Sequence, residues 1–118
     1  MRILFCGDRN WTNESLIKEE LLKFDTTRDI IIHGCARGAD RIAGYTAKEL
    51  GFKVEAFPAQ WDLYGRAAGA IRNRQMLNTK PDFVIAFHNN ILESKGTANC
   101  VKTAKHRGIS VKLVTEHA

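Results

Sequence analysis

The chain has 118 residues, of which 44% are hydrophobic and 26% charged, and we expect one globular domain over residues 1–118. Eighteen lysines and arginines against 13 acids give a net charge of +5, which favours anionic partners, yet no dense basic run marks a nucleic-acid-binding arm. No apolar stretch approaches the ~18 residues that a membrane span needs. The N-terminal apolar run is short and is followed by Asp8 and Arg9, so we expect a cytoplasmic protein without a signal peptide.

Short apolar runs alternate with longer amphipathic stretches along the chain, and this alternation predicts strands and helices in turn. The expected strands are Arg2–Cys6, Asp29–His33, Lys53–Phe57, Asp82–Phe87 and Ser110–Val114. The expected helices are Asn13–Phe24, Gly38–Leu50, Arg66–Thr79 and Gly96–Arg107. We expect Thr12 to cap the first helix, and we interpret residues 58–65 and 88–95 as loops.

This pattern predicts an α/β fold, a Rossmann-like three-layer sandwich with a five-stranded parallel sheet. Right-handed crossovers favour the strand order 3-2-1-4-5. A binding crevice then lies where the order reverses, at the carboxyl ends of strands 1 and 4. The loops that end there are Gly7–Trp11, Gly34–Asp40 and His88–Thr97.

Glycine-containing turns follow two of the buried strands. Gly34 and Gly38 permit close backbone approach, and the helix that follows presents unpaired N–H groups that can bind phosphate. Arg37 can add a bidentate contact, but a tight turn without a ligand fits equally well, since the spacing is neither GxGxxG nor a Walker A loop. Asp40 either stabilises the helix dipole or bonds to a ribose hydroxyl or to the first-strand loop.

The second turn, Ser94-Lys95-Gly96-Thr97, opens the last helix in the same way. Its N–H groups and the Thr97 hydroxyl can hold a phosphate, or can form a plain helix cap.

The third helix and two loops carry the remaining candidates. At 100° per residue, Arg74 falls among apolar residues, while Arg72 points to roughly the opposite side. Arg74 then forms a salt bridge or extends to the surface. Trp11 and Trp61 lie in polar loops, where each can stack on a base, cover an edge of the core or contact a second copy.

The cysteines and histidines predict neither metal nor disulfide. Cys6, Cys35 and Cys100 are far apart, form no CxxC pair and are odd in number, as in a reducing compartment. Cys6 is expected to pack in the sheet, whereas Cys35 and Cys100 lie close to the two turns. The histidines, His117 included, lack metal-ligand spacing, and we expect no metal and no cofactor.

Five motifs in chain order resemble the YspA-related branch of the SLOG superfamily, which consists of small Rossmann-like proteins of bacteria and phages. They are GDRxW at 7–11, HGCARGAD at 33–40, PAxW at 58–61, GxxAGxxRN at 65–73 and KGT at 95–97. The superfamily includes the lonely-guy phosphoribohydrolases, the DprA DNA-binding proteins and sensor domains for nucleotide-derived signals. The resemblance implies a nucleotide-type ligand and pairing of copies.

The lonely-guy enzymes carry an arginine four residues before a methionine, and Arg72 and Met76 match this spacing. Their PGGxGTxxE motif is matched only in part, by Gly96-Thr97. Leu92-Glu93-Ser94 replaces PGG, and Cys100 replaces the glutamate that assists cleavage. The resemblance therefore implies a phosphate and ribose pocket without the enzymes' catalytic acid.

We therefore expect a protein that binds an ADP-ribose-like molecule or a nucleoside phosphate, as a sensor or a sequestering protein. The expected phosphate ligands are Gly34, Arg37, Gly38, Gly96 and Thr97; Asp8, Asp40 and Asn73 would bond to ribose, Arg72 would neutralise charge, and Trp11 or Trp61 would stack on the base. Gly7, Arg9 and Ser94 complete the candidate site.

Two alternatives remain open. One is a nucleoside-phosphate N-glycoside hydrolase that uses Arg72 with Asp8 or Glu93. The other is DprA-like DNA binding, which the missing basic stripe disfavours. We also expect a homodimer or higher oligomer, with residues 61–76 as the candidate interface.

Overall fold

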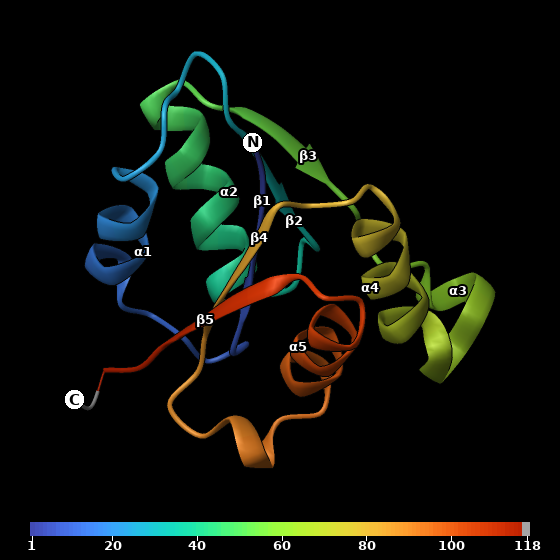
Figure 1. Cartoon of the computed structure of the whole chain (residues 1–118). Coiled ribbons are helices and arrows are strands. Elements are labelled where there is room, and N and C mark those ends of the chain that lie inside the picture. The colour runs from blue at the N-terminus through green and yellow to red at the C-terminus, as the bar shows by residue number, and fades with distance from the viewer. Residues whose placement is uncertain (117–118) are drawn as a thin grey trace.

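The computed structural model describes residues 1–116 and shows a parallel sheet between two layers of helices (Figure 1). The strands are β1 (Arg2–Gly7), β2 (Ile30–His33), β3 (Lys53–Ala56), β4 (Phe83–Phe87) and β5 (Ser110–Val114). The helices are α1 (Glu14–Leu21), α2 (Ala39–Leu50), α3 (Trp61–Tyr64), α4 (Ala68–Asn78) and α5 (Gly96–His106), with short 3₁₀ turns η1 (Gly65–Ala67) and η2 (Ile91–Glu93). His117 lies outside the described residues.

The five strands are all parallel and have the order β3-β2-β1-β4-β5, which confirms the predicted fold class and strand order. β1 lies at the centre, with Leu4 between Ile32 of β2 and Val84 of β4. The carboxyl ends of β1 and β4 are neighbours, because Gly7 pairs with Phe87. The switch point of the sheet is therefore formed by the loops that follow these two residues.

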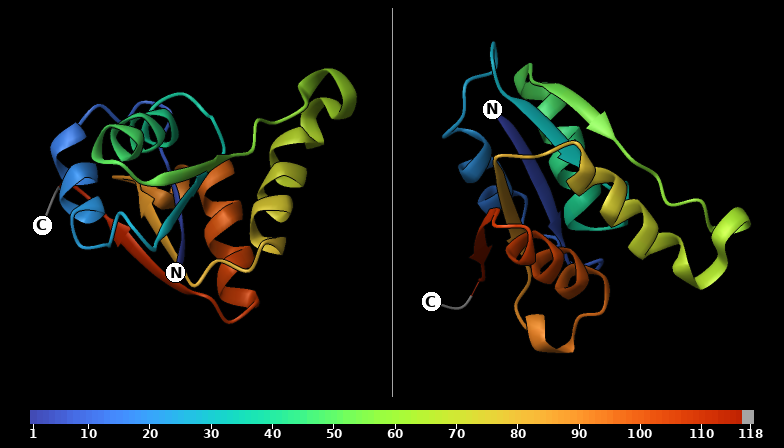
Figure 2. Two further views of the ribbon diagram at one scale, coloured as in Figure 1. Left: turned by 90° about the horizontal axis from the view of Figure 1, so that it is seen from above. Right: turned by 45° about the vertical axis from the view of Figure 1, so that its right-hand side comes forward.

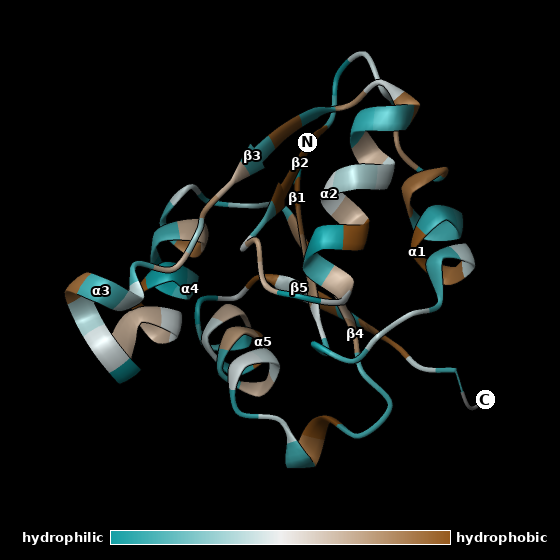
Figure 3. Cartoon of the chain, turned by 180° about the vertical axis from the view of Figure 1, so that it is seen from behind, coloured by the Kyte–Doolittle hydropathy of each residue, from teal (hydrophilic) through white to brown (hydrophobic). Residues whose placement is uncertain are grey.

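Each face of the sheet has its own core, because successive side chains of a strand point to opposite faces. Ile3 and Phe5 of β1 pack with α1 and α2, whereas Leu4 and Cys6 pack with α4 and α5 (Figure 2). Strands that are covered on both faces have the continuous apolar sequences seen here. Figure 3 shows hydrophobic residues along the central strands. No helix within residues 1–116 is long and apolar enough to cross a membrane.

The ends of α1 differ from the prediction. Asn13, not Thr12, caps the helix, because its side-chain oxygen accepts a hydrogen bond from Leu16 N at 3.2 Å. The helix ends at Leu21 instead of Phe24, since the N–H groups of Lys23 and Phe24 donate to the carbonyls of Glu20 and Leu21 in tighter turns.

Both long loops of the prediction contain short helices. Residues 58–65 include α3, which has no buried residue and projects beyond the start of α4 (Figure 2). Residues 88–95 include η2, where Leu92 is 94% exposed. α3 buries no residue, and η2 packs only Ile91 against the core, so hydrophobic patterning carries little signal for these two elements.

Candidate functional site

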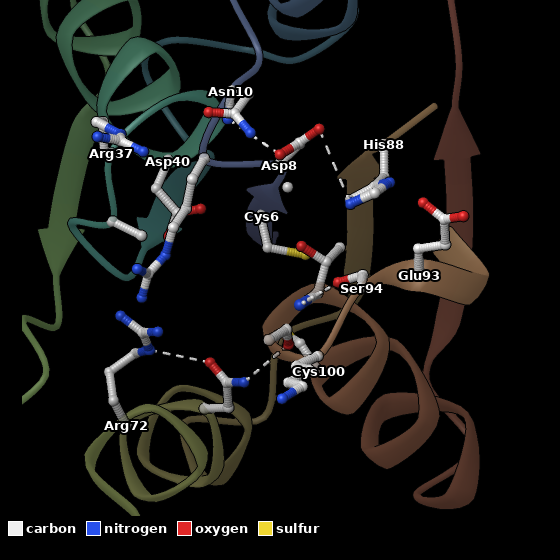
Figure 4. Close-up of a pocket in the computed structure, with 17 residues that line it drawn as sticks. Cys6, Asp8, Asn10, Arg37, Asp40, Arg72, His88, Glu93, Ser94 and Cys100 are labelled. Carbon is white, nitrogen blue, oxygen red and sulfur yellow. Dashed lines mark hydrogen bonds and ion pairs between the residues drawn. The ribbon is translucent and has the colours of Figure 1, made fainter. Parts of the chain in front are cut away.

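A cavity of about 450 Å³ opens at the carboxyl ends of β1 and β4 (Figure 4). It lies at the predicted switch point, between the start of α2 on one side and the start of α5 on the other. Most of the predicted site residues line it, namely Gly7, Asp8, Arg9, Arg37, Asp40, Arg72, Asn73, Ser94, Gly96 and Thr97. Its size is in the range of small-molecule sites.

Arg72 of α4 is buried at the wall of this cavity, with 8% of its surface exposed. Its Nη1 donates to the carbonyl of Gly34, and its Nε donates to Asn73 Oδ1 at 2.9 Å. Nη2 has no hydrogen-bond partner among residues 1–116, and the guanidinium points into the cavity (Figure 4). The charge of Arg72 acts on the nearby Asp40 carboxyl, and Nη2 leaves a donor that a further acceptor in the cavity can use.

The structure reverses the predicted orientation of α4. Arg72 lies on the buried face with Ala68 and Met76, at a spacing of four residues, whereas Arg74 is exposed. The apolar residues beside which Arg74 was expected to lie include Ala70 and Ile71, and both are only partly buried.

Asn73 is buried and its amide is engaged by the protein. Its Nδ2 donates to Gly96 O at 3.3 Å and to Asn99 Oδ1 at 3.1 Å, while its Oδ1 accepts from Arg72. Asn73 thus joins α4 to the start of α5 and orients Arg72. Both Nδ2 protons of Asn73 are therefore used, and a ribose hydroxyl can reach Asn73 only by donating to Oδ1 beside Arg72.

Asp40, in the first turn of α2, is buried against its own loop. Its Oδ2 accepts a hydrogen bond from Gly34 N at 2.9 Å. Burial raises the pKa of Asp40 from its ordinary 3.8 to about 6, and the N–H groups of Gly34, Ala36 and Gly7 oppose this rise, as does the charge of Arg72. Asp40 thus accepts this hydrogen bond from its own loop, and its expected bond to a ribose hydroxyl stays a prediction.

The two glycines of the first turn make room for protein atoms. A Cβ on Gly38, whose φ is +84°, would lie 2.3 Å from the Asp8 carbonyl oxygen. Ala39 N donates to that same oxygen at 3.1 Å, so Gly38 holds the loops after β1 and β2 together and does not line the cavity. A Cβ on Gly34 would lie 2.6 Å from Arg72 Nη1. Gly34 thereby permits Arg72 to pack.

At the start of α5, a serine occupies part of the expected phosphate site. Ser94 Oγ accepts from Thr97 N at 3.0 Å and from Ala98 N at 3.2 Å. Gly96 N has no acceptor within the described part of the chain, and a Cβ on Gly96 would meet nothing within 4 Å. The N–H of Gly96 and the hydroxyl of Thr97 therefore remain available to an anion.

Carboxylates from the loop after β1 and from η2 also line the cavity. Asp8 Oδ1 accepts from Asn10 N at 3.0 Å, and Asp8 Oδ2 lies 3.9 Å from His88 Nε2. Glu93 is exposed and lines the same cavity. Carboxylates of this kind can accept hydrogen bonds from sugar hydroxyls.

Sequence reasoning missed several lining residues, among them Asn10, His88 and Lys95. All three belong to loops that the strand order had already selected, so position alone could have found them. Cys6 and Cys100 line the same cavity, where a hydrogen bond with the Cys100 side chain and then burial raise the pKa of Cys6. No cluster of potential metal ligands occurs within residues 1–116.

A second cavity, also of about 450 Å³, adjoins the first and shares Arg9, Arg37 and Arg72 with it. Its outer wall includes Trp61, which is 49% exposed. The guanidinium carbon of Arg9 lies 6.0 Å from the centroid of the Trp61 ring, within cation–π range. Trp61 thus lines the second cavity, and its stacking on a base stays a prediction.

Trp11 is in the core and lines neither cavity. Only 3% of it is exposed, its ring packs edge-on against Phe87 at 5.6 Å, and its Nε1 donates to Asn13 O at 2.8 Å. The expectation that Trp11 stacks on a base is therefore wrong, and the alternative that it covers the core is correct.

Comparison with known proteins gives three findings. The sequence profile of the YspA, cpYpsA-related SLOG family matches residues 1–64. The "Gene 61 protein" of Mycobacterium phage D29 is 34% identical over 118 residues, an alignment that covers 93% of each chain. The fold is similar to that of DNA processing protein A (DprA) of Streptococcus pneumoniae, with a TM-score of 0.74 at 17% identity. That match covers 95% of this chain, which spans about half of the DprA chain (49%).

Proposed function

Because the chain belongs to the YspA, cpYpsA-related SLOG family, we propose that it binds a nucleotide-derived ligand in the cavity at the carboxyl ends of β1 and β4. The ligand is an ADP-ribose-like molecule or a nucleoside phosphate, and the protein is a sensor or a sequestering protein. The observation that carries this proposal is Arg72, a buried cation with an unpaired Nη2 in the cavity wall.

The charged side chains of the cavity are suited to both the phosphate and the ribose of such a ligand. Arg37, Arg72 and Lys95 provide cations for phosphate. Asp8 and Glu93 provide acceptors for ribose hydroxyls. A ligand that carries only one of these groups would leave the other set of side chains without a partner.

Arg37 is suited to test the proposal, because it is exposed and makes no hydrogen bond or ion pair within residues 1–116. Its removal should therefore leave the fold intact. Arg74 is a matched control: it is also exposed, but it lines neither cavity.

The experiment is calorimetric titration with AMP, ADP, ribose 5-phosphate and ADP-ribose, paired with chromatography of the recovered ligand. A charge-assisted hydrogen bond is worth ~1.5–3 kcal/mol, so Arg37→Ala should weaken binding by about tenfold or more. Arg74→Ala should bind like the wild type. If no ligand of the panel binds, or if both variants bind equally well, the proposal is wrong.

A second candidate is hydrolysis of the N-glycosidic bond, which one observation favours. Asp40 lies in the cavity wall with a pKa of about 6, near the value that suits a general acid. Release of free base, lost in Asp40→Asn while the variant still binds nucleotide, would establish an enzyme. Recovery of intact ligand after prolonged incubation would mean that the protein binds nucleotides without hydrolysing them.

DNA binding is a weaker alternative, supported by the name of the structural neighbour, DNA processing protein A. A single-stranded oligonucleotide added to the same panel tests it. Binding to a phosphate backbone would lose affinity steeply as salt rises. Salt-insensitive or absent oligonucleotide binding would dismiss it.

Pairing of two copies through residues 61–76 is also part of the proposal. Trp61, Leu63 and Tyr64 of α3 are all exposed, at 49%, 68% and 41%. Exposed apolar groups of this kind are typical of interfaces. A monomeric mass in sedimentation at all concentrations would exclude the pairing.

A further inference from the structure

The two adjoining cavities differ in chemistry. The cavity beside Trp61 is lined by the arginines Arg9, Arg37, Arg41 and Arg72 and by no carboxylate. The cavity at β4 contains Asp8, Asp40 and Glu93 as well as cations. The cavity beside Trp61, which we call the outer compartment, is therefore suited to anions and flat rings. The cavity at β4, which we call the inner compartment, can also accept hydrogen bonds from hydroxyls.

The boundary between the compartments is cationic. The side chains common to both are Arg9, Ala36, Arg37 and Arg72. Arg9 and Arg37 are exposed and have no ion-pair partner in the described part of the chain, and Arg72 has an unpaired Nη2. Three guanidinium groups on one boundary match an anion that passes from one compartment to the other and carries more than one charge.

The outer compartment has the features of a base subsite. Trp61 offers a half-exposed ring, Pro58 and Ala59 add apolar surface, and Arg9 lies over the ring at 6.0 Å. A base can stack on an exposed indole ring of this kind. Arg41 is fixed in place, since its Nε donates to Cys35 O at 3.1 Å.

The inner compartment has the features of a sugar and phosphate subsite. Asp8 and Glu93 can accept from hydroxyls, and Gly96 N–H can donate to a phosphate oxygen. A mononucleotide in the outer compartment would reach the arginines but would leave these groups unused.

We propose that the two cavities form one bipartite site for a nucleoside diphosphate that carries a second sugar. Its base lies against Trp61, its diphosphate crosses the boundary at Arg9, Arg37 and Arg72, and its second sugar enters the compartment of Asp8 and Glu93. This inference rests on the proposed function and specifies its ligand class.

The test compares three probes by calorimetry: ADP-ribose, AMP and ribose 5-phosphate. ADP-ribose should bind about tenfold or more tightly than AMP, because only ADP-ribose fills both compartments. Trp61→Ala should weaken ADP-ribose and AMP by about fivefold or more, and should leave ribose 5-phosphate unchanged. Glu93→Gln should weaken ADP-ribose and ribose 5-phosphate, and should leave AMP unchanged. Tyr45→Ala, an exposed aromatic of α2 outside both cavities, is the control.

The outcomes separate the two levels of the proposal. If none of the probes binds, the proposed function fails and this inference with it. If AMP binds as tightly as ADP-ribose, or if Trp61→Ala affects all three probes equally, the nucleotide site stands and the bipartite site is wrong. The crossed pattern of the two variants is the result that supports it.

Discussion

His33 and Asp40 lie at opposite ends of the same loop and should make the stability of the fold depend on pH in opposite ways. Burial, with Lys48 and Arg72 nearby, lowers the pKa of His33 from 6.5 to about 4. The geometry agrees, because His33 Nδ1 accepts a hydrogen bond from Cys35 N at 3.1 Å, which requires an unprotonated nitrogen. Burial raises the pKa of Asp40 from 3.8 to about 6.

The signs follow from linkage. The unfolded chain takes up a proton on His33 more readily than the folded protein does, so stability is lost as pH falls from 6.5 to 4. The folded protein holds the Asp40 proton more tightly, so stability is lost as pH rises from 3.8 to 6. At ~1.4 kcal/mol for each pKa unit, each group changes the unfolding free energy by about 2 kcal/mol between pH 4.5 and 6.5, and the two effects nearly cancel.

Single substitutions at His33 and Asp40 should reveal the pH dependence that each group contributes. In His33→Asn the amide oxygen can still accept a hydrogen bond from Cys35 N. The unfolding free energy of this variant should rise by about 2 kcal/mol relative to that of the wild type as pH is lowered from 6.5 to 4.5. Asp40→Asn should gain a similar amount as pH is raised over that range. Urea unfolding at both pH values measures the differences. If either variant differs from the wild type by the same amount at both pH values, the assigned protonation states are wrong.

Three further predictions concern residues in the site and in the loops around it. Arg72→Ala leaves two buried acceptors without a donor and should lower the unfolding free energy by about 2–4 kcal/mol. The control Arg74→Ala should change it by less than about 0.5 kcal/mol. Equal effects of the two variants in urea unfolding would contradict the buried position of Arg72. Gly38→Ala should lower the free energy of unfolding by about 2 kcal/mol or more, because the new Cβ would meet backbone at 2.3 Å. Gly96→Ala should leave it unchanged or raise it by about 0.5 kcal/mol. Thermal melts compare the two variants, and a Gly38→Ala variant as stable as the wild type would refute the close packing of the two loops. Cys35, which is half-buried, should react with iodoacetamide at pH 8.5 in the folded protein, while the other two cysteines react only after unfolding; mass spectrometry counts the labels, and three labels on folded protein would count against the buried pair.

The topology could be predicted because it depends on features that are local in sequence. Apolar runs such as Ile30–Ile32 and Phe83–Phe87 are too short for helices and are separated by amphipathic segments. Once the strands are parallel, right-handed crossovers and the count of five strands favour the order 3-2-1-4-5, and this order places the switch point. The location of the site followed without any knowledge of a side-chain contact.

The roles of single residues were harder to predict, because they depend on which groups already have partners. Ser94 and Asp40 provide acceptors for N–H groups that were expected to bind phosphate, and the Asn73 amide is used between two helices. The Ser94 cap could have been predicted from its spacing of three residues before Thr97. The contacts of Asn73 could not, since they depend on how α4 meets α5.

Trp11 and Arg72 show the limits of polarity as a guide to exposure. Trp11 lies in a polar loop, but its backbone N–H donates to Asp8 O at 3.1 Å and its ring packs onto Phe87. α4 carries apolar residues on more than one side, so its sequence alone does not identify the face toward the core. The buried face includes an arginine because the Gly34 carbonyl and Asn73 accept its hydrogen bonds.

The most direct test of the nucleotide site is amide chemical-shift mapping of the ¹⁵N-labelled protein during titration with ADP-ribose. The account predicts that the largest shifts occur at Asp8, Arg37, Gly96 and Thr97, at the carboxyl ends of β1 and β4. The amino ends of the strands, such as Asp82, should not respond. No change in the spectrum, or changes concentrated at the amino ends, would contradict the central claim.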